Sequence, residues 1–359
     1  MRIGVPAEVK QDEYRVALTP SGAYELVRDG HEVWVESGAG VGAGCPDSDY
    51  ERVGAHIGDT AAAWLGELIV KVKEPQPSEF GFLHDDQILF TYLHLAANPG
   101  VADALRRSGT TAVAYETVED RERRLPLLAP MSEIAGRLSI QAGARYLERP
   151  MGGSGVLLGG VAGVAPGTVV IVGAGSVGVN AAMVATGIQA NVVVVDTDLN
   201  RLRALEGILP GRVTLLHSSR LTLEELLPTA DLVVGAVLLP GALSPRLITA
   251  DALELMRPGS VVVDVAVDQG GCIETSRPTT HSDPVFTVSG ITHYCVANMP
   301  GAVPVTASQA LCNATLPYIQ LIASEGLTEA TRRRDELREG LNIQAGKIMN
   351  AAVAEALST

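Results

Sequence analysis

The feature that most constrains this chain is a long stretch without charged side chains, which covers residues 150–195. A stretch of this length could hold a transmembrane helix. Pro166 and repeated glycines interrupt it, however, so that no continuous apolar helix fits. We therefore interpret the stretch as a loop, strand, turn, helix and second strand in a buried α/β core.

The rest of the chain repeats this alternation of short apolar runs and helical patterns, which is typical of βαβ units and a mainly parallel sheet. The pattern predicts helices at 20–29 and 99–108, and it becomes wholly helical after residue 305. We predict strands at 2–5, 31–35, 68–72, 88–93 and 111–115, and a second series at 168–172, 191–195, 212–216, 232–236 and 260–265.

The length of 359 residues suggests two domains, at roughly 100–200 residues each. Because a helical tail usually packs on an earlier domain, we expect one domain from residues 1–127 plus 304–359. A second domain at 128–303 would then be inserted into the first. The expected fold class is α/β, with two Rossmann-like, doubly wound parallel sheets.

Charge and cysteine usage exclude several classes of partner. The chain has 41 acidic and 27 basic residues, a net charge of −14, which argues against nucleic acid because phosphate binding needs a concentrated basic surface. The four cysteines form no CxxC pair and no metal-ligand spacing. We therefore expect reduced thiols and no metal, and, with no secretory signal at the N-terminus, a cytoplasmic protein without a membrane partner.

A glycine-rich turn is the strongest local motif. It follows the predicted strand 168–172, opens a helix, and reads Gly173, Ala174, Gly175, Ser176, Val177, Gly178. In such a G-x-G-x-x-G turn the first glycine permits the tight bend, the second lets a pyrophosphate approach the backbone, and the third allows close helix–strand packing. The free N–H groups of the helix would bind the phosphates.

An acidic residue for the ribose hydroxyls is needed about 20 positions further on, and Asp196 stands at the end of the next strand. Its charge would repel a 2′-phosphate, so we predict NAD rather than NADP as cofactor. Arg201 could border the adenosine, although an ordinary surface role is the alternative for this residue. The alternative for the whole motif is a glycine turn that serves packing alone.

Four polar residues stand where predicted strands end, the edge at which open parallel sheets bind ligands. Lys73 follows the apolar run 68–72, His94 follows 88–93, Asp268 follows 260–265, and Arg15 lies in the loop after 2–5. Singly, each could be structural, and Lys71 could replace Lys73 because both lie on the same strand face. A buried lysine needs an anionic partner to offset its desolvation, which favours a functional role.

Together these residue types suit one chemistry. A guanidinium binds a carboxylate through two hydrogen bonds, and an ammonium provides a second positive charge. A histidine transfers a proton near neutral pH. Beside a nicotinamide, this set predicts hydride transfer at the α-carbon of a small 2-amino or 2-hydroxy acid.

The chain resembles a known family, the alanine dehydrogenases, over nearly its whole length. The segments that carry the resemblance are MRIGVPAEVKQDEYRVALTP, LIVKVKEP, ILFTYLHLAANP, AYETV, PLLAPMSEIAGRLSIQAGARYLE, GVLLGGVAGV, VDVAVDQGGCIETSRPTTHSDPVF and HYCVANMPGAVPVTAS. The same fold resembles the NAD(H)-binding subunit of proton-translocating transhydrogenase, but YLHLA and VKVKEP resemble the dehydrogenase branch.

The resemblance implies reversible, NAD-dependent oxidative deamination of L-alanine to pyruvate and ammonia by a homo-oligomer, typically a hexamer. It implies that the domain at 1–127 plus 304–359 holds the substrate, whereas the domain at 128–303 holds NAD. In this family Arg15 and Lys73 bind substrate, and His94 and Asp268 perform acid–base work. The resemblance further places Met131 and Asn298 at the substrate, and Ser132, Ser218, Val237 and Leu238 at the cofactor.

Three hypotheses therefore stay open. The chain is a dehydrogenase of alanine or of another small 2-amino acid, a transhydrogenase-like NAD(H)-binding subunit, or a noncatalytic NAD sensor. The second would need a membrane partner. The third would be expected to have lost part of the set of Arg15, Lys73, His94 and Asp268, which is intact.

Overall fold

The structure is a computed structural model that describes residues 1–209, 211, 213–237 and 244–358. It divides into two compact units, one of Met1–Met131 with Gly301–Thr359 and one of Ser132–Pro300. The first break falls inside helix α5 (Ala129–Leu147). The predicted α/β class with two mainly parallel sheets is confirmed.

The first unit is built on a mainly parallel sheet, for which the described residues give eight strands in the order β15-β14-β6-β5-β4-β1-β2-β3. All neighbours from β6 to β3 are parallel, and the chain returns as β14 and β15 to add an antiparallel edge. The strands are β1 (Arg2–Val5), β2 (Glu32–Glu36), β3 (His56–Gly58), β4 (Leu68–Val70), β5 (Ile88–Thr91), β6 (Thr111–Ala114), β14 (Leu341–Gln344) and β15 (Lys347–Ile348).

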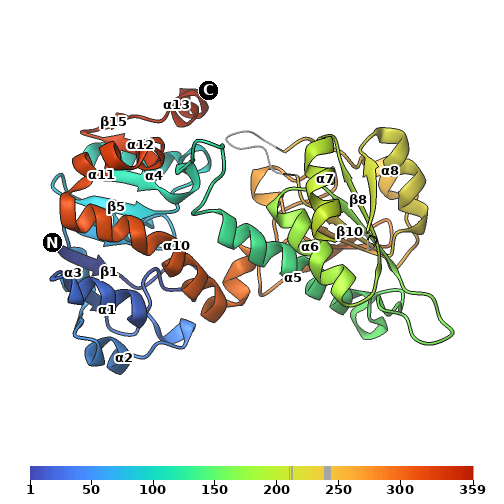
Figure 1. Ribbon diagram of the computed structural model, residues 1–359, viewed down its shortest axis with the longest axis horizontal. Coiled ribbons are helices and arrows are strands. Elements are labelled where there is room, and N and C mark those ends of the chain that lie inside the picture. Colours follow the sequence, from blue (N-terminus) through green and yellow to red (C-terminus); the bar gives the residue numbers. More distant parts are fainter. Residues whose placement is uncertain (210, 212, 238–243, 359) are drawn as a thin grey trace. The chain divides into compact units, whose positions relative to one another are not determined.

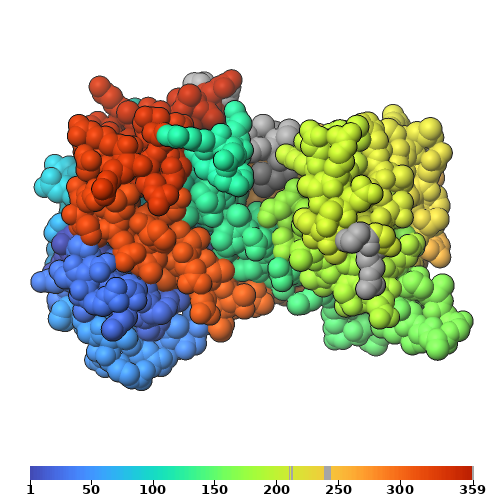
Figure 2. Space-filling model, in the orientation of Figure 1, coloured from blue at the N-terminus to red at the C-terminus, as the bar shows by residue number. Residues whose placement is uncertain are grey.

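Helices from both ends of the chain cover this sheet (Figure 1). In Figure 2 the red and orange C-terminal segment lies directly on the blue N-terminal segment, in line with the packing of α10 against α1. The helices are α1 (Pro20–Arg28), α2 (Asp47–Arg52), α3 (Thr60–Trp64), α4 (Pro99–Ser108), α10 (Pro304–Glu325), α11 (Leu327–Arg333), α12 (Asp335–Gly340) and α13 (Ala351–Ser358).

The second unit has a sheet in the order β12-β13-β11-β10-β7-β8-β9, in which only β12 among the described strands is antiparallel. Its strands are β7 (Thr168–Val172), β8 (Asn191–Asp196), β9 (Thr214–His217), β10 (Leu232–Gly235), β11 (Val261–Asp264), β12 (Val285–Val288) and β13 (Ile291–Tyr294). Its helices, besides most of α5, are α6 (Ser176–Gly187), α7 (Leu199–Ile208), α8 (Arg220–Leu226) and α9 (Ala250–Leu253).

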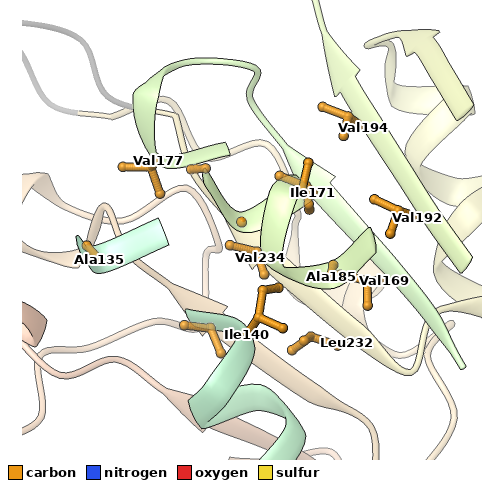
Figure 3. Close-up of a cluster of buried hydrophobic side chains, with 14 of the residues drawn as sticks. Ala135, Ile140, Val169, Ile171, Val177, Ala185, Val192, Val194, Leu232 and Val234 are labelled. Carbon is orange, nitrogen blue, oxygen red and sulfur yellow. The ribbon is translucent and has the colours of Figure 1, made fainter. Parts of the chain in front are cut away.

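The apolar runs of the uncharged stretch form the centre of this second sheet. Val169 and Ile171 point to one face, where they pack with Val192 and Val194 and with residues of α5 and α6 (Figure 3). The intervening residues, such as Val170, point to the opposite face and form a second cluster. Burial on both faces explains why the strands are continuously apolar rather than alternating. Among the described residues, no helix has the length and apolar character needed to span a membrane.

The prediction of a wholly helical segment after residue 305 is wrong, because β14 and β15 lie there. Ile343 is fully buried against β6, and residues Ala345 and Gly346 form a tight turn with positive φ between the two strands. Strands β3, β12 and β13 were also not predicted. These are short strands at or near sheet edges, whose pairing depends on neighbours distant in sequence.

Candidate functional site

Each sheet contains a point at which the strand order reverses, and the predicted site residues follow the strands there. In the first unit β1 lies between β4 and β2, and in the second β7 lies between β10 and β8. At such switch points the loops after the strands diverge and leave a crevice at their carboxyl ends. The loops after β1, β4 and β5 carry Arg15, Lys73 and His94, respectively.

Arg15 is buried and its orientation is set by a carboxylate two residues earlier. Its Nε donates to Glu13 Oε1 at 2.6 Å and its Nη2 to Glu13 Oε2 at 2.5 Å. Burial alone would raise the pKa of Glu13, but these hydrogen bonds and the positive charge of Arg15 lower it. Arg15 Nη1 contacts Met131 Sδ at 3.1 Å, so the structure brings two of the predicted substrate residues together.

The two lysines that follow β4 differ in their surroundings. The ammonium of Lys71 is fully buried between Glu79 Oε1 at 2.8 Å and Glu8 Oε2 at 3.3 Å. Although burial opposes the charge, these two carboxylates raise the pKa of Lys71. Lys71 is therefore a structural ion-pair residue.

Lys73 is also buried, at 8% exposure, but among the described residues none forms an ion pair or hydrogen bond with its ammonium. Burial and then the positive charge of Arg15 lower the pKa of Lys73. A buried ammonium beside a guanidinium is a position that an incoming carboxylate would stabilise. Of the two lysines, the geometry favours Lys73 as the one that could bind an anion.

His94 lies three residues beyond the end of β5 rather than within the strand. Its backbone is left-handed (φ 47°) and its side chain is 41% exposed. The imidazole stacks on Tyr92 with ring centroids 5.9 Å apart. Glu116, at the turn after β6, accepts the backbone N–H of His94 at 2.6 Å. The His94 side chain is thus accessible, while a hydrogen bond to Glu116 restrains its backbone.

The glycine turn between β7 and α6 has the geometry of a dinucleotide-binding turn. A Cβ at Gly173 (φ 109°) would lie 2.7 Å from the carbonyl oxygen of Ala236, and one at Gly178 would lie 1.8 Å from that of Gly173. A Cβ at Gly175 would meet no heavy atom within 4 Å. Gly173 and Gly178 therefore shape the turn, whereas Gly175 borders open space at the start of α6, where Ser176 is exposed and Val177 is buried.

Asp196, the last residue of β8, is buried and holds this turn. Its Oδ2 accepts the N–H of Ala174 at 2.6 Å, and its Oδ1 accepts the N–H of Asp198 at 2.8 Å. Each carboxylate oxygen has a second lone pair, so a ribose hydroxyl could still donate to Asp196. Arg201 Nη1 lies 3.9 Å from Asp196 Oδ2, and Ser218 donates its N–H to the Asp196 carbonyl at 2.9 Å.

The remaining predicted residues of the second unit lie on other loops. Val237 follows β10 and packs where a Gly173 side chain would point, whereas Leu238 lies outside the described residues. Asn298 has a positive φ of 65°, and its carbonyl lies 3.1 Å from His281 Nε2. Ser132 is half-buried in α5.

Asp268 does not end its strand, because β11 ends at Asp264. Asp268 is exposed in a short 3-10 turn (Val267–Gln269). Asp264 is fully buried, and it accepts the N–H groups of Ala266 and Ile273, both at 3.1 Å. Burial raises the pKa of Asp264.

Sequence reasoning missed the carboxylates that organise these loops, namely Glu13, Glu79, Glu116 and Asp264. The available signal was an acidic residue within or beside an apolar run, as in VVVDVAVD. In the described parts of the chain, no three His, Cys, Asp or Glu side chains gather in a way that could hold a metal ion.

Two family models match the chain. The model described as "Alanine dehydrogenase/PNT, N-terminal domain" matches residues 4–135, and "Alanine dehydrogenase/PNT, C-terminal domain" matches residues 139–351. The chain is 53% identical over 358 residues to an alanine dehydrogenase of Halomonas elongata, covering 99% of this chain and 96% of that protein.

Solved structures give the same result. A structure titled L-alanine dehydrogenase superimposes with a TM-score of 0.97 at 53% identity and covers 100% of this chain and 99% of its own. A transhydrogenase from Sinorhizobium meliloti shares the fold, with a TM-score of 0.85 at 24% identity over 97% of this chain and 100% of its own. On these grounds the chain belongs to the alanine dehydrogenase/PNT family.

Proposed function

We propose that this chain is an NAD-dependent L-alanine dehydrogenase, which interconverts L-alanine and water with pyruvate and ammonia. The observation that carries the proposal is the buried ammonium of Lys73, which lies near Arg15 and forms no ion pair with a carboxylate of the described residues. A small substrate carboxylate would supply the missing negative charge. The relatives named above, alanine dehydrogenases by title, support the same substrate.

The second unit fits a dinucleotide. The open space at Gly175 and the N-terminus of α6 would accept the pyrophosphate, and Asp196 would accept a ribose hydroxyl. Because a 2′-phosphate would lie against the Asp196 carboxylate, we propose NAD over NADP. When bound, the cofactor supplies a hydride acceptor. We assign Arg201 to the binding of this cofactor, together with Ser218, Ser132 and Val237, for which the resemblance to the family implies this role.

The substrate residues would act in the following way. Lys73 and Arg15 hold the carboxylate of alanine, with Met131 and Asn298 lining the remainder. Once the α-carbon has lost its hydride, water attacks the resulting iminium carbon. His94 takes the proton from that water and returns it to the departing amine, and Asp268, as the second proton carrier, takes the proton of the carbinolamine hydroxyl. Ammonia leaves as the carbonyl of pyruvate forms.

One assay tests the proposal against its alternatives. The purified protein should oxidise NADH with pyruvate plus ammonium, but not with pyruvate alone. Turnover without ammonium would indicate a hydroxy-acid dehydrogenase. Faster turnover with a larger 2-oxo acid plus ammonium would indicate another amino-acid substrate, and NADH binding without any turnover would contradict an enzymatic role.

His94 provides the residue-level test of this mechanism. Loss of a general acid–base group should lower the rate about 10²–10⁴-fold, so His94→Ala should lower kcat in this range. His56→Ala, at an exposed histidine of β3, is the matched control and should keep the wild-type rate. Near-normal turnover in His94→Ala would contradict the assignment.

We further propose a homohexamer, as the resemblance to the family implies, and a cytoplasmic location, as the expected reduced thiols indicate. Light scattering on the purified protein should give six times the chain mass of 37.5 kDa. A mass of one or two chains would contradict the hexamer.

A further inference from the structure

Two side chains hold the left-handed turn at His94: Asn98 donates from its Nδ2 to the His94 carbonyl oxygen at 3.0 Å, and the carboxylate of Glu116 accepts on the N–H side. The N–H of His94 donates to Glu116 Oε1 at 2.6 Å, and the N–H of Leu93 lies 3.2 Å from both Glu116 oxygens. Non-glycine residues rarely adopt positive φ, and they do so only where the surroundings fix the backbone. Hydrogen bonds to an ionised acceptor are strong enough to provide this fixation.

The same carboxylate also faces the imidazole. Glu116 Oε1 lies 4.0 Å from His94 Nδ1, and the Glu116 side chain is only 14% exposed. This separation is too long for a direct hydrogen bond, but it places the carboxylate on the Nδ1 side of the ring, where it faces a proton on Nδ1 and not one on Nε2. Nε2 is then the atom that accepts and returns a proton.

The plane of the imidazole is fixed by a different residue. The Tyr92 ring lies parallel to the His94 ring, with an interplanar angle of 7°. Tyr92 is itself locked, because its hydroxyl donates to the carbonyl oxygen of Leu127 at 2.7 Å. Tyr92 therefore limits ring tilt, whereas Glu116 fixes the backbone and the Nδ1 side.

We propose that Glu116 is a positioning residue for His94, which holds the left-handed turn and directs proton transfer to Nε2. This inference rests on the proposed function, in which His94 carries protons at the substrate. Glu116 does not itself contact the substrate in this role, so it should affect kcat while leaving the KM for pyruvate, which reports Lys73 and Arg15, nearly unchanged.

Two substitutions of Glu116 separate the two parts of the role, and a third substitution elsewhere is the control. Glu116→Gln keeps an oxygen that can accept the His94 N–H but removes the charge beside Nδ1, whereas Glu116→Ala removes both. We expect kcat to fall about tenfold in Glu116→Gln and about 100-fold in Glu116→Ala, within the range of a general acid–base contribution. Glu122→Gln, an exposed carboxylate six residues along the chain, is the matched control.

A double-mutant cycle shows whether Glu116 acts through His94. In a His94→Ala background, adding Glu116→Gln should change kcat less than about twofold, because the residue that Glu116 positions is absent. A second full loss of activity in this background, or near-wild-type kcat in Glu116→Ala, would overturn the proposal.

A crystal structure of Glu116→Ala gives a readout that does not depend on turnover. We expect residue 94 to leave the left-handed region, and a retained φ near the wild-type value would overturn the proposal. If Glu116→Ala does not fold, the Glu116→Gln cycle still decides. A wild-type protein that does not aminate pyruvate would overturn the proposed function instead, while the crystal structure would still test the hold of Glu116 on the turn.

Discussion

Lys71 and Lys73 are two residues apart and both buried, yet their ammonium groups have opposite surroundings. Lys71 is neutralised by Glu8 and Glu79, whereas Lys73 lies near the positive charge of Arg15. The apolar run at 68–72, which contains Lys71 and is followed by Lys73, indicated that one of the two lysines would be functional, but not which. The partners that decide lie in the loop after β1 and in the turn at Pro77–Phe82, and sequence spacing does not show which carboxylate reaches which lysine.

The two lysines should therefore respond differently to the same substitution. Lys71→Met leaves two buried carboxylates unpaired and should lower the free energy of unfolding by about 3–5 kcal/mol. Lys73→Met removes a buried charge and should leave the free energy of unfolding equal or higher, while the KM for pyruvate rises at least about tenfold. Urea unfolding and steady-state kinetics on both variants check this prediction, and exchanged phenotypes would contradict it.

The lowered pKa of Lys73 predicts a pH dependence. The unfolded chain holds the Lys73 proton more tightly than the folded protein. The contribution of Lys73 to the free energy of unfolding therefore rises with pH. Pyruvate, in contrast, needs the charged form, so its affinity should fall as the pH rises from neutrality towards about 10, below the usual titration range of lysine. The measurement is the dissociation constant of pyruvate from the NADH complex without ammonium.

Lys73→Met is the control for this titration, because it should bind pyruvate weakly at every pH. A wild-type affinity that stays constant over this range would show that Lys73 keeps its proton throughout, and would contradict the prediction.

At the scale of elements, the glycines of the turn between β7 and α6 have two different roles: Gly178 allows the turn to pack, and Gly175 leaves room for the cofactor. Gly178→Ala places a methyl group against the Gly173 carbonyl, and should lower the free energy of unfolding by about 1–3 kcal/mol. Gly175 has an extended backbone (φ −77°) and borders open space, so Gly175→Ala should fold normally but bind NADH at least about tenfold more weakly. Thermal unfolding and NADH fluorescence titration distinguish the two, and tight NADH binding by Gly175→Ala would place the pyrophosphate elsewhere.

The loop after β11 depends on Asp264, which ties it to the strand. In Asp264→Asn, the NH₂ group would face the N–H of either Ala266 or Ile273 in place of an accepting oxygen, so we expect a loss of about 1–3 kcal/mol in stability. Because Asp268 lies in this loop, kcat should fall more than the KM for pyruvate rises. Asp251→Asn, at an exposed position at the start of α9, is the control. Unchanged stability and kcat in Asp264→Asn would show that the loop holds without the carboxylate.

Elements that bury a continuous apolar run were predictable from the sequence. β1 and β7 have the predicted bounds, because runs such as TVVIV are apolar on both faces. β14 was not predictable, since Leu341–Gln344 becomes a strand only where β6 offers an edge. Lys73 and His94 were expected directly after strands at 68–72 and 88–93, but these strands end earlier, at Val70 and Thr91. The sequence showed which polar residues follow each strand. It did not show the hydrogen bonds in the loops, which direct the chain away from the sheet.

At the scale of the whole molecule, the first compact unit is formed by two segments that are separate in the sequence. The C-terminal family model spans residues 139–351, yet the structure assigns Gly301–Thr359 to the same unit as Met1–Met131. The net charge of −14 gives no general attraction for an anionic substrate. Attraction must therefore be local, at buried cations such as Lys73 in the first unit and at the N-terminus of α6 in the second.

Hydrogen exchange should accordingly show two separable footprints. NADH alone should slow amide exchange at residues 173–178 and near Asp196, because bound phosphates and ribose would protect the N–H groups of this turn. Pyruvate added to the NADH complex should slow exchange further at 71–75 in the first unit. Lys73→Met should lose the second footprint and keep the first, whereas Gly175→Ala should lose the first. Protection by NADH alone that is strongest at 71–75 would contradict the assignment of the pyrophosphate to the glycine turn and of the substrate carboxylate to Lys73.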